Sequence, residues 1–98
     1  MRRILIQPPA QVDLLEIWHY LAPSSISAAN KIVEKIKDAI DGLAEMPGKG
    51  HQRADVRNRR YRFWRVYSYM IAYSFDEQTI TIARVVHGSR NFRRLFRR

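Results

Sequence analysis

The chain has 98 residues and no cysteine, which excludes a disulfide framework and thiolate chemistry. Hydrophobic residues make up 46% of it, a share typical of a globular protein, and we expect residues 1–98 to form a single domain. It carries 18 Lys and Arg against 9 Asp and Glu, a net charge of +9, which favours an anionic partner.

The positive charge is concentrated in the second half of the chain. Residues 1–48 carry five Lys/Arg and six Asp/Glu, a balance of −1, whereas residues 49–98 carry thirteen and three, a balance of +10. Most of these cations are arginines, whose planar guanidinium binds carboxylates and phosphates bidentately. The pattern predicts a surface for nucleic acid or for an acidic protein, with solvated surface charge as the simpler alternative.

The first residues predict a short strand followed by a helix. Residues 2–7 are apolar at their centre, and Pro8-Pro9 ends this strand and can open a helix, where a missing N–H costs nothing. Asp13 is expected near the start of the helix, where the helix dipole favours negative charge. Apolar residues then follow at helical spacing: Leu14, Ile17, Trp18 and Leu21. The apolar run before Gln7 is too short for a signal peptide or a membrane span, so we expect a cytoplasmic protein.

A second, longer helix is predicted after a serine-rich turn. Pro23 interrupts the first helix, the serines after it offer an N-cap, and Pro47-Gly48 stops the second helix. Its apolar residues keep one stripe across four turns: Ala29, Ile32, Val33, Ile36, Ile40 and Leu43. Two helices joined by so short a turn are expected to form an antiparallel hairpin.

Three strands are predicted after a loop over residues 49–60. Period-two patterns cover residues 61–66, 69–75 and 79–86, and the turns between them are short enough for hairpins. In the last of these strands we expect Ile80, Ile82 and Val86 to share a face, with Arg84 breaking the row. The predicted fold is α+β, a helical hairpin packed on an antiparallel β-sheet in the order β-α-α-β-β-β. A basic C-terminal tail follows, either as a last helical turn or as a strip that orders on binding.

Three segments together carry a family resemblance. DLLEIWHYLA (13–22) has an acidic start and a central tryptophan, and LAEMPGKGHQRADV (43–56) has a Pro-Gly loop followed by an arginine. FWRVYSYMIAYSF (63–75) and IARVVHGSRN (82–91) cover the last three predicted strands, and the second carries a His-Gly-x-Arg ending over residues 87–90. In this order and spacing they resemble the ParE/RelE superfamily of toxins from type II toxin–antitoxin systems, and the ending is similar to that of the ParE branch.

The resemblance implies a toxin of a plasmid-stabilisation module and an acidic, ParD-like antitoxin that is partly disordered until it binds. It also implies two alternative activities, since ParE-like members poison DNA gyrase and RelE-like members cleave mRNA on the ribosome. No cofactor is expected for either activity. His19 and His51 are far apart in a chain without cysteine, so no metal site is expected either.

An endoribonuclease would need proton-transfer groups and a cation at the scissile phosphate. Arg65 and Arg84 could supply the cation and His87 the acid or base, although a hydrogen bond that finishes the strand is the simpler role for His87. RelE-like nucleases also place a tyrosine near the end of the last strand, and here no tyrosine follows Tyr73. We therefore favour a binding inhibitor of gyrase without catalytic residues, and keep ribosome-dependent mRNA cleavage as the alternative.

Partner contacts are expected on the helical hairpin and on the basic second half. The candidate contact residues are Trp18, Arg53, Arg60, Arg62, Trp64, Arg84, Arg90, Arg93 and Arg94. The tryptophans could instead be core residues, and Arg53 could pair with the neighbouring Asp55. Charge at Arg60 and Arg62 is expected to speed association with the acidic antitoxin, more so at low salt.

Overall fold

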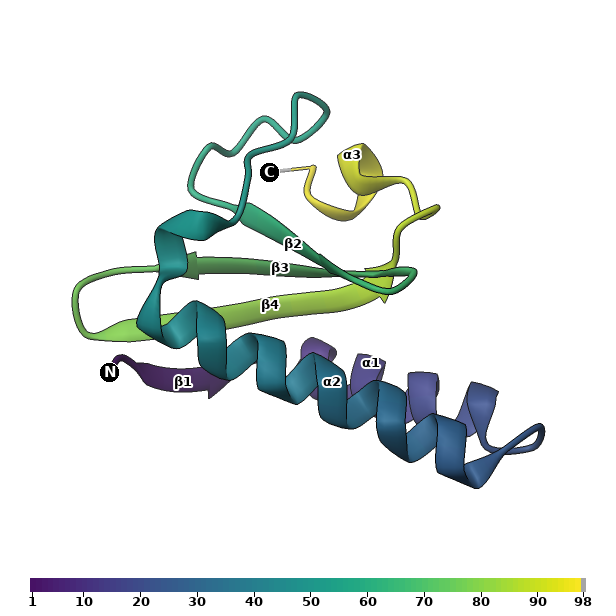
Figure 1. Cartoon of the computed structure of the whole chain (residues 1–98). Helices are drawn as coiled ribbons and strands as arrows, with labels where there is room; N and C mark the ends of the chain where they lie inside the picture. Colours follow the sequence, from purple (N-terminus) through teal and green to yellow (C-terminus); the bar gives the residue numbers. More distant parts are fainter. Residues whose placement is uncertain (98) are drawn as a thin grey trace.

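The computed structural model describes residues 1–97, and it places one four-stranded sheet between two covering layers (Figure 1). The elements are β1 (Arg3–Ile6), α1 (Pro8–Leu21), α2 (Ile26–Glu45), a 3-10 turn (Pro47–Lys49), β2 (Arg62–Val66), β3 (Tyr69–Phe75), β4 (Thr79–His87) and α3 (Phe92–Leu95). This confirms the predicted α+β class and the predicted order of elements, and the basic tail begins with a short helix. Within the described residues, no helix is both long and apolar enough to cross a bilayer.

Local sequence signals set the ends of the two long helices. Pro8 and Pro9 open α1, where the first N–H groups have no partner within the helix. The Ser25 hydroxyl caps α2 by accepting a hydrogen bond from the Ala28 N–H at 3.1 Å. The helices form the predicted hairpin, which covers one side of the sheet (Figure 1). Asp13 lies in the middle of α1 rather than in its first turn, so the expected contact with the helix dipole was wrong.

The sheet has the strand order β1-β4-β3-β2. Strands β2, β3 and β4 form the predicted antiparallel meander. Strand β1 pairs with β4 in parallel, with Ile4 opposite Ile80 and Ile6 opposite Ile82, so the sheet is mixed and not antiparallel throughout. The two strands are far apart in the sequence, so no tight hairpin joins them and forces an antiparallel direction.

A bulge in β4 changes which of its residues share a face. Ala83 has no residue opposite it, because the register with β3 shifts at this point. Ile80 and Ile82 pack with Val85 on the side of the helices, whereas Val86 packs on the opposite side. The expectation that Val86 joins Ile80 and Ile82 was therefore wrong, since a period of two does not continue through a bulge.

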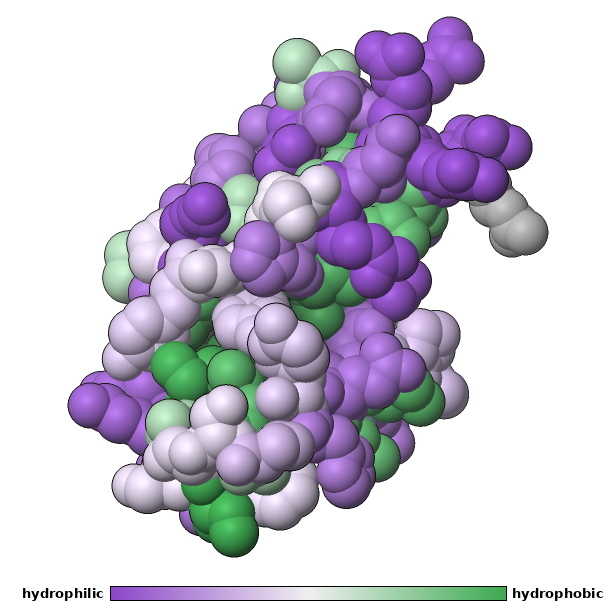
Figure 2. Space-filling model, turned by 90° about the vertical axis from the view of Figure 1, so that its right-hand side faces the viewer, coloured by the Kyte–Doolittle hydropathy of each residue, from purple (hydrophilic) through white to green (hydrophobic). Residues whose placement is uncertain are grey.

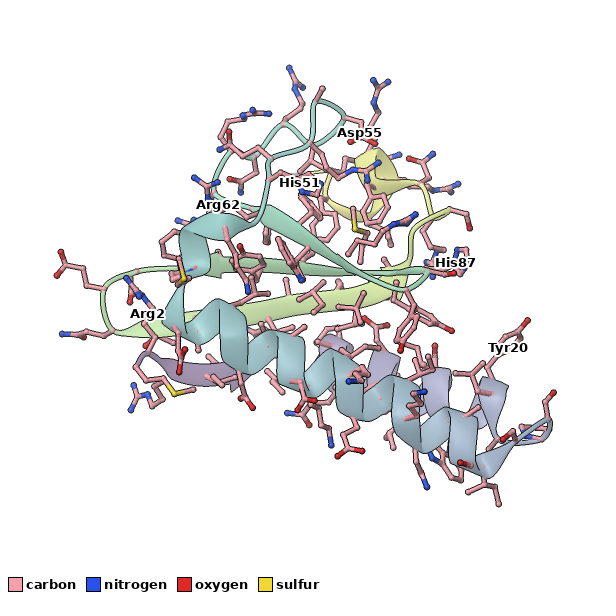
Figure 3. All side chains as sticks on the ribbon, viewed as in Figure 1. Arg2, Tyr20, His51, Asp55, Arg62 and His87 are labelled. Carbon is pink, nitrogen blue, oxygen red and sulfur yellow. The ribbon has the colours of Figure 1, made fainter. Side chains whose placement is uncertain are left out.

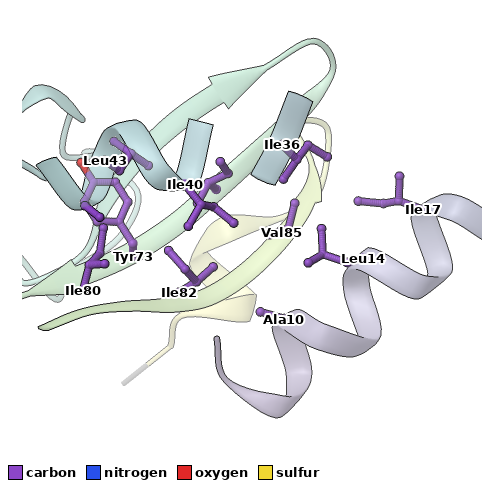
Figure 4. Packing of buried hydrophobic residues seen from close by; sticks show 12 residues of the cluster. Ala10, Leu14, Ile17, Ile36, Ile40, Leu43, Tyr73, Ile80, Ile82 and Val85 are labelled. Atoms are coloured by element: carbon purple, nitrogen blue, oxygen red, sulfur yellow. The ribbon is translucent and has the colours of Figure 1, made fainter. Parts of the chain in front are cut away.

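The side of the sheet that faces α1 and α2, the helix side, carries the larger core. Its buried residues are Ala10, Leu14, Ile17, Ile36, Ile40, Leu43, Ala44, Ile71, Tyr73, Ile80, Ile82 and Val85 (Figure 4). The helices contribute aliphatic residues only, which interdigitate with the branched side chains of the strands. The stripe predicted for α2 faces this core, so the hairpin is held on the sheet by the hydrophobic effect.

The opposite side of the sheet, the far side, has a separate and more aromatic core. Its buried residues are Val56, Phe63, Met70, Ala72, Val86, Phe92 and Phe96. Phe63 meets Phe92 edge-on, with ring centroids 5.6 Å apart. The loop after α2 and the short helix α3 cover this core, as Figure 1 shows above the sheet.

Tyr73 fixes the point where the loop leaves the helix side. Its hydroxyl donates to the Pro47 carbonyl at 2.5 Å and accepts from the Gly50 N–H at 3.0 Å. A Cβ on residue 50 would lie 2.1 Å from that hydroxyl, so only glycine fits there. Burial raises the pKa of Tyr73, which keeps the hydroxyl protonated as a donor.

Candidate interaction surfaces

The three residues considered for RNA cleavage are not assembled into one site, and Arg84 is the clearest case. Its Nε and Nη2 donate to the two carboxylate oxygens of Asp13 at 2.7 and 2.9 Å, and the Val85 N–H donates to the same carboxylate at 2.9 Å. Asp13 is only 6% exposed, and its hydrogen bond raises the pKa of Arg84. The pair ties α1 to β4, beyond the point where β1 ends.

Arg65 and His87 lie on different faces of the sheet. Arg65 is opposite Met70 on the far side, and its guanidinium lies against Gly88, where a Cβ would be 3.2 Å from Nη1. His87 is opposite Tyr69, which packs on the helix side, and the two rings meet edge-on with centroids 5.9 Å apart. Within residues 1–97, no hydrogen bond or ion pair joins any two of these three side chains, although the Arg65 guanidinium reaches the residue next to His87.

The exposed ring of His87 takes part in the turn that follows β4. Its Nδ1 lies 2.8 Å from the Ser89 hydroxyl and accepts a hydrogen bond from the Ser89 N–H at 3.1 Å. The Arg90 N–H donates to the His87 carbonyl at 3.0 Å. Through these contacts His87 ends β4 and holds the turn that follows, which is the simpler of the two roles considered for it.

A groove on the helix side runs between α1 and the ends of β3 and β4. It has a volume of about 600 Å³ and is lined by Asp13, Glu16, Ile17, Tyr20, Leu21, Ile32, Tyr67, Ser68, Tyr69, Val85, Val86, His87 and Arg90. We call it the apolar groove, because most of its lining residues are aromatic or aliphatic. Tyr20 stands at its outer wall, 79% exposed, and Figure 3 shows it projecting from the end of the hairpin.

The outer face of the hairpin carries three large apolar side chains that are more than half exposed. Val12, Leu15 and Ile26 are 51%, 61% and 61% exposed, and green residues gather over the lower part of Figure 2. Spacing alone did not reveal this face, because α1 has apolar residues on both of its sides. Exposed apolar residues that form a patch mark a surface for a partner.

The far side carries the arginine-rich surface that the charge distribution predicted. A groove of about 410 Å³ between the loop and α3 is lined by Asp55, Arg57, Asn91, Arg93, Arg94, Phe96 and Arg97. We call it the arginine groove. Purple residues gather over the upper part of Figure 2, on the half of the molecule away from the hairpin.

Arg53 has the ion pair that was considered for it. Its Nε and Nη2 donate to the Asp55 carboxylate at 2.9 and 3.0 Å, which lowers the pKa of Asp55. The same guanidinium lies 4.0 Å from the centre of the Phe92 ring. Arg53 therefore ties the loop to α3 and is largely committed inside the protein.

The two tryptophans are partly buried, and each has a polar contact. The indole N–H of Trp18 donates to the Asn30 side chain at 2.7 Å and so links α1 to α2. Trp64 packs against the core of the helix side, and the Lys49 ammonium lies 4.8 Å from its ring centre. Both therefore stabilise the fold, whatever their part in binding.

The remaining candidate arginines are divided between the two ends of the sheet. Arg62 donates to the Gly50 carbonyl at 2.9 Å, and Arg60 is exposed beside it; in Figure 3 Arg62 lies at the end away from His87. Arg90 follows β4 at the other end and borders the apolar groove. On its outer side β2 has one isolated bridge, from Phe63 to His51, and no further strand pairs with it in residues 1–97.

Within residues 1–97, no group of three or more side chains of the types that bind metals lies close enough to hold an ion.

The family comparison agrees with this fold. The sequence profile described as the ParE toxin of type II toxin–antitoxin system, parDE, matches residues 4–92. The chain is similar to the chromosomal ParDE toxin–antitoxin system from P. aeruginosa, with a TM-score of 0.73 and 20% identity over 89% of this chain and 96% of that chain. No curated protein matches the sequence.

Two further solved structures share the fold at low identity. The YoeB dimer from Staphylococcus aureus has a TM-score of 0.59 and 18% identity, over 88% of this chain and 95% of that chain. The RelBE2 toxin–antitoxin complex from Mycobacterium tuberculosis has a TM-score of 0.53 and 22% identity, over 88% and 96%. At such identities the likeness extends to the fold and not to the activity.

Proposed function

We propose that this chain, which belongs to the ParE family of toxins from type II toxin–antitoxin systems, inhibits DNA gyrase by binding to it. In this proposal it acts in the cytoplasm, performs no covalent chemistry, and is neutralised by a cognate acidic antitoxin encoded in the same plasmid-stabilisation module. Residues 1–98 act as one toxin domain.

The contacts of Arg84 and His87 carry this proposal, because Arg84 is paired with Asp13 and His87 is hydrogen-bonded to the turn after β4. RNA cleavage needs a cation and a proton-transfer group at one phosphate, within hydrogen-bond reach of the reacting atoms. Here Arg84 is held by Asp13, and the other two side chains lie on different faces of the sheet. The arrangement favours a protein that binds its target over one that cleaves RNA.

The outer face of the hairpin is the surface we propose for gyrase. Val12, Leu15 and Ile26 give it exposed apolar area, and removal of apolar area from water is the main favourable term in most protein–protein association. The hairpin is also firmly anchored to the sheet, so the face is already in its binding conformation. The basic C-terminal segment is a second contact region in this proposal, for the complex of gyrase with its DNA.

The antitoxin is proposed to bind the apolar groove and the end of the sheet near Arg60 and Arg62. An amphipathic segment that runs along the sheet could bury apolar side chains against Leu21, Ile32 and Tyr69 at one end and place carboxylates near these arginines at the other end. Replacing Arg60 and Arg62 together by alanine should slow association more at low salt than at high salt. Equal effects at both salt concentrations would argue against electrostatic steering.

Plasmid supercoiling by purified gyrase, with ATP, tests the proposal directly. The wild-type protein should abolish supercoiling and leave cleaved DNA, and His87→Ala should inhibit equally well. Leu15→Glu should weaken inhibition at least tenfold, because it places a charge in the proposed contact. Gln78→Glu is the matched control, since it adds the same charge on the exposed β3–β4 turn, and it should change little.

The competing outcome is equally specific. If a folded, toxic preparation leaves supercoiling undisturbed, cleaves mRNA on translating ribosomes, and loses that cleavage in His87→Ala, the gyrase proposal is wrong.

A further inference from the structure

The arginine groove has a wall on each side, and both walls are fixed to the core of the far side. Asn91 caps α3 by accepting a hydrogen bond from the Arg94 N–H at 3.1 Å, and Phe92 and Phe96 anchor that helix among the buried aromatic residues. On the loop wall, the Arg59 guanidinium donates to the Arg53 carbonyl at 3.1 Å. The groove is therefore preorganised, which lowers the entropic cost of binding.

The charge in this groove is not neutralised within the described residues. Four of its lining residues are exposed arginines: Arg57, Arg93, Arg94 and Arg97. The only carboxylate in the lining, Asp55, is already paired with Arg53 at 2.9 Å. Over residues 1–97, the other ion pair joins Asp13 and Arg84 on the opposite side of the molecule. Four cations therefore converge on one groove, with Asp55 satisfied by another arginine.

The aromatic residues near the groove do not offer a stacking surface. Phe92 and Phe96 are 0% and 7% exposed, and the Tyr61 ring packs against Phe96 with centroids 4.9 Å apart. A single-stranded nucleic acid is held largely by stacking of its bases on exposed aromatic rings. An acidic peptide, in turn, needs pockets for its apolar anchors, and those are found in the apolar groove instead.

We propose that the arginine groove binds the sugar-phosphate backbone of duplex DNA, without preference for sequence. Guanidinium groups grip phosphates bidentately, and backbone contacts of this kind need neither stacking nor apolar pockets. The site goes beyond gyrase binding, because the toxin contacts DNA by itself and on the side opposite the apolar groove. A toxin that holds both gyrase and its DNA could remain on the complex while the DNA is cleaved.

Fluorescence anisotropy with a short labelled duplex, titrated at several KCl concentrations, tests this inference without gyrase. The slope of log K against log salt should show about three to four phosphate contacts, or roughly −3. The variant Arg57→Ala, Arg93→Ala, Arg94→Ala should bind at least tenfold more weakly and lose most of this slope. The control Lys31→Ala, Lys35→Ala, Lys37→Ala removes the same charge from exposed positions of α2 and should keep both. Circular dichroism confirms that each variant is folded.

Three results would overturn the inference. Equal loss in both triple variants would mean that net charge alone attracts the DNA. Tighter binding of single-stranded RNA than of duplex DNA would assign the groove to a different nucleic acid. Displacement of the duplex by polyglutamate at equal charge concentration would assign it to an acidic protein. Because gyrase is absent from the assay, none of these outcomes bears on the supercoiling result.

Discussion

The two sides of the sheet are covered by different kinds of structure. On the helix side, helices of 14 and 20 residues bury a broad aliphatic core. On the far side, an irregular loop and a helix of 4 residues cover an aromatic core. The first cover belongs to the half of the chain with a charge balance of −1, and the second to the half with +10.

The side of the sheet that contributes most to stability is therefore not the side that carries most of the positive charge. The long helices can stabilise the fold through extensive apolar burial, without exposing many like charges. The far cover concentrates arginines around few buried residues, each of them large. We therefore expect substitutions on the helix side to change the free energy of unfolding most, and substitutions on the far side to change binding most.

The largest expected effect is at the ion pair that joins α1 to β4. Asp13→Ala leaves Arg84 and the Val85 N–H without their acceptor, and removing one partner of a buried pair costs about 3–5 kcal/mol. Urea unfolding measures the loss. Asp38→Ala, an exposed carboxylate on α2, should stay within about 0.5 kcal/mol of wild type. Similar losses in both variants would show that the pair is not a special anchor of the helix side.

The core of the helix side comes next. Ile36 is 0% exposed, and Ile36→Ala should lower the free energy of unfolding by about 3 kcal/mol through lost burial and a residual cavity. Thermal and urea unfolding should agree on this value. Ile26→Ala is the same deletion at a residue 61% exposed, and it should have little effect on stability.

The helix side could be predicted from sequence because its signals are local. The proline pair, the capping serine and the 3.6-residue stripe of α2 each act within a few neighbouring residues. The parallel pairing of β1 with β4 and the bulge at Ala83 could not be predicted in this way, because both depend on how distant strands meet. The same holds for Asp13 and Arg84, which are 71 residues apart, although a carboxylate within the apolar stripe of α1 was a usable signal.

Of the far side, only its excess of positive charge could be predicted from the sequence. Residues 49–60 show no period, and contacts from elsewhere hold them, such as the Tyr73 hydroxyl at Gly50 and the ring of Phe92 under Arg53. The sequence indicated which half carries the arginines but not which of them are free. Arg53 and Arg84 turned out to be paired inside the protein, whereas Arg57 and Arg97 line a groove that sequence reasoning missed.

The third prediction concerns the strength of the far cover. Phe92→Ala should cost less than about 3 kcal/mol, since a short helix can detach locally and so limit the loss. Detachment should expose the peptide bonds after Arg93 and Arg94 to trypsin and speed cleavage severalfold. Phe75→Ala removes the same ring from a residue 37% exposed and should leave this cleavage unchanged. A loss as large as that of Ile36→Ala would mean that the two covers unfold as one unit.

The smallest effect should come from the ion pair of the loop. The hydrogen bond from Arg53 lowers the pKa of Asp55 from its usual value, so the ionised carboxylate stabilises the fold above the pKa of the unfolded chain. That contribution is lost as the pH falls through the folded pKa. Asp55→Asn should therefore cost on the order of 0.5 kcal/mol at neutral pH, since the carboxylate is 38% exposed, and nothing under strongly acidic conditions.

Urea unfolding of the wild type and of Asp55→Asn, from neutral pH to strongly acidic conditions, measures the difference in their free energies of unfolding. A loss that persists in acid would come from packing rather than from charge. A loss that disappears in acid would come from the charge pair of Arg53 and Asp55, and its small size would mean that charges on this side contribute little to folding. The exposed arginines of the groove would then be free to serve a ligand, which is what a binding surface built on a small, separate core requires.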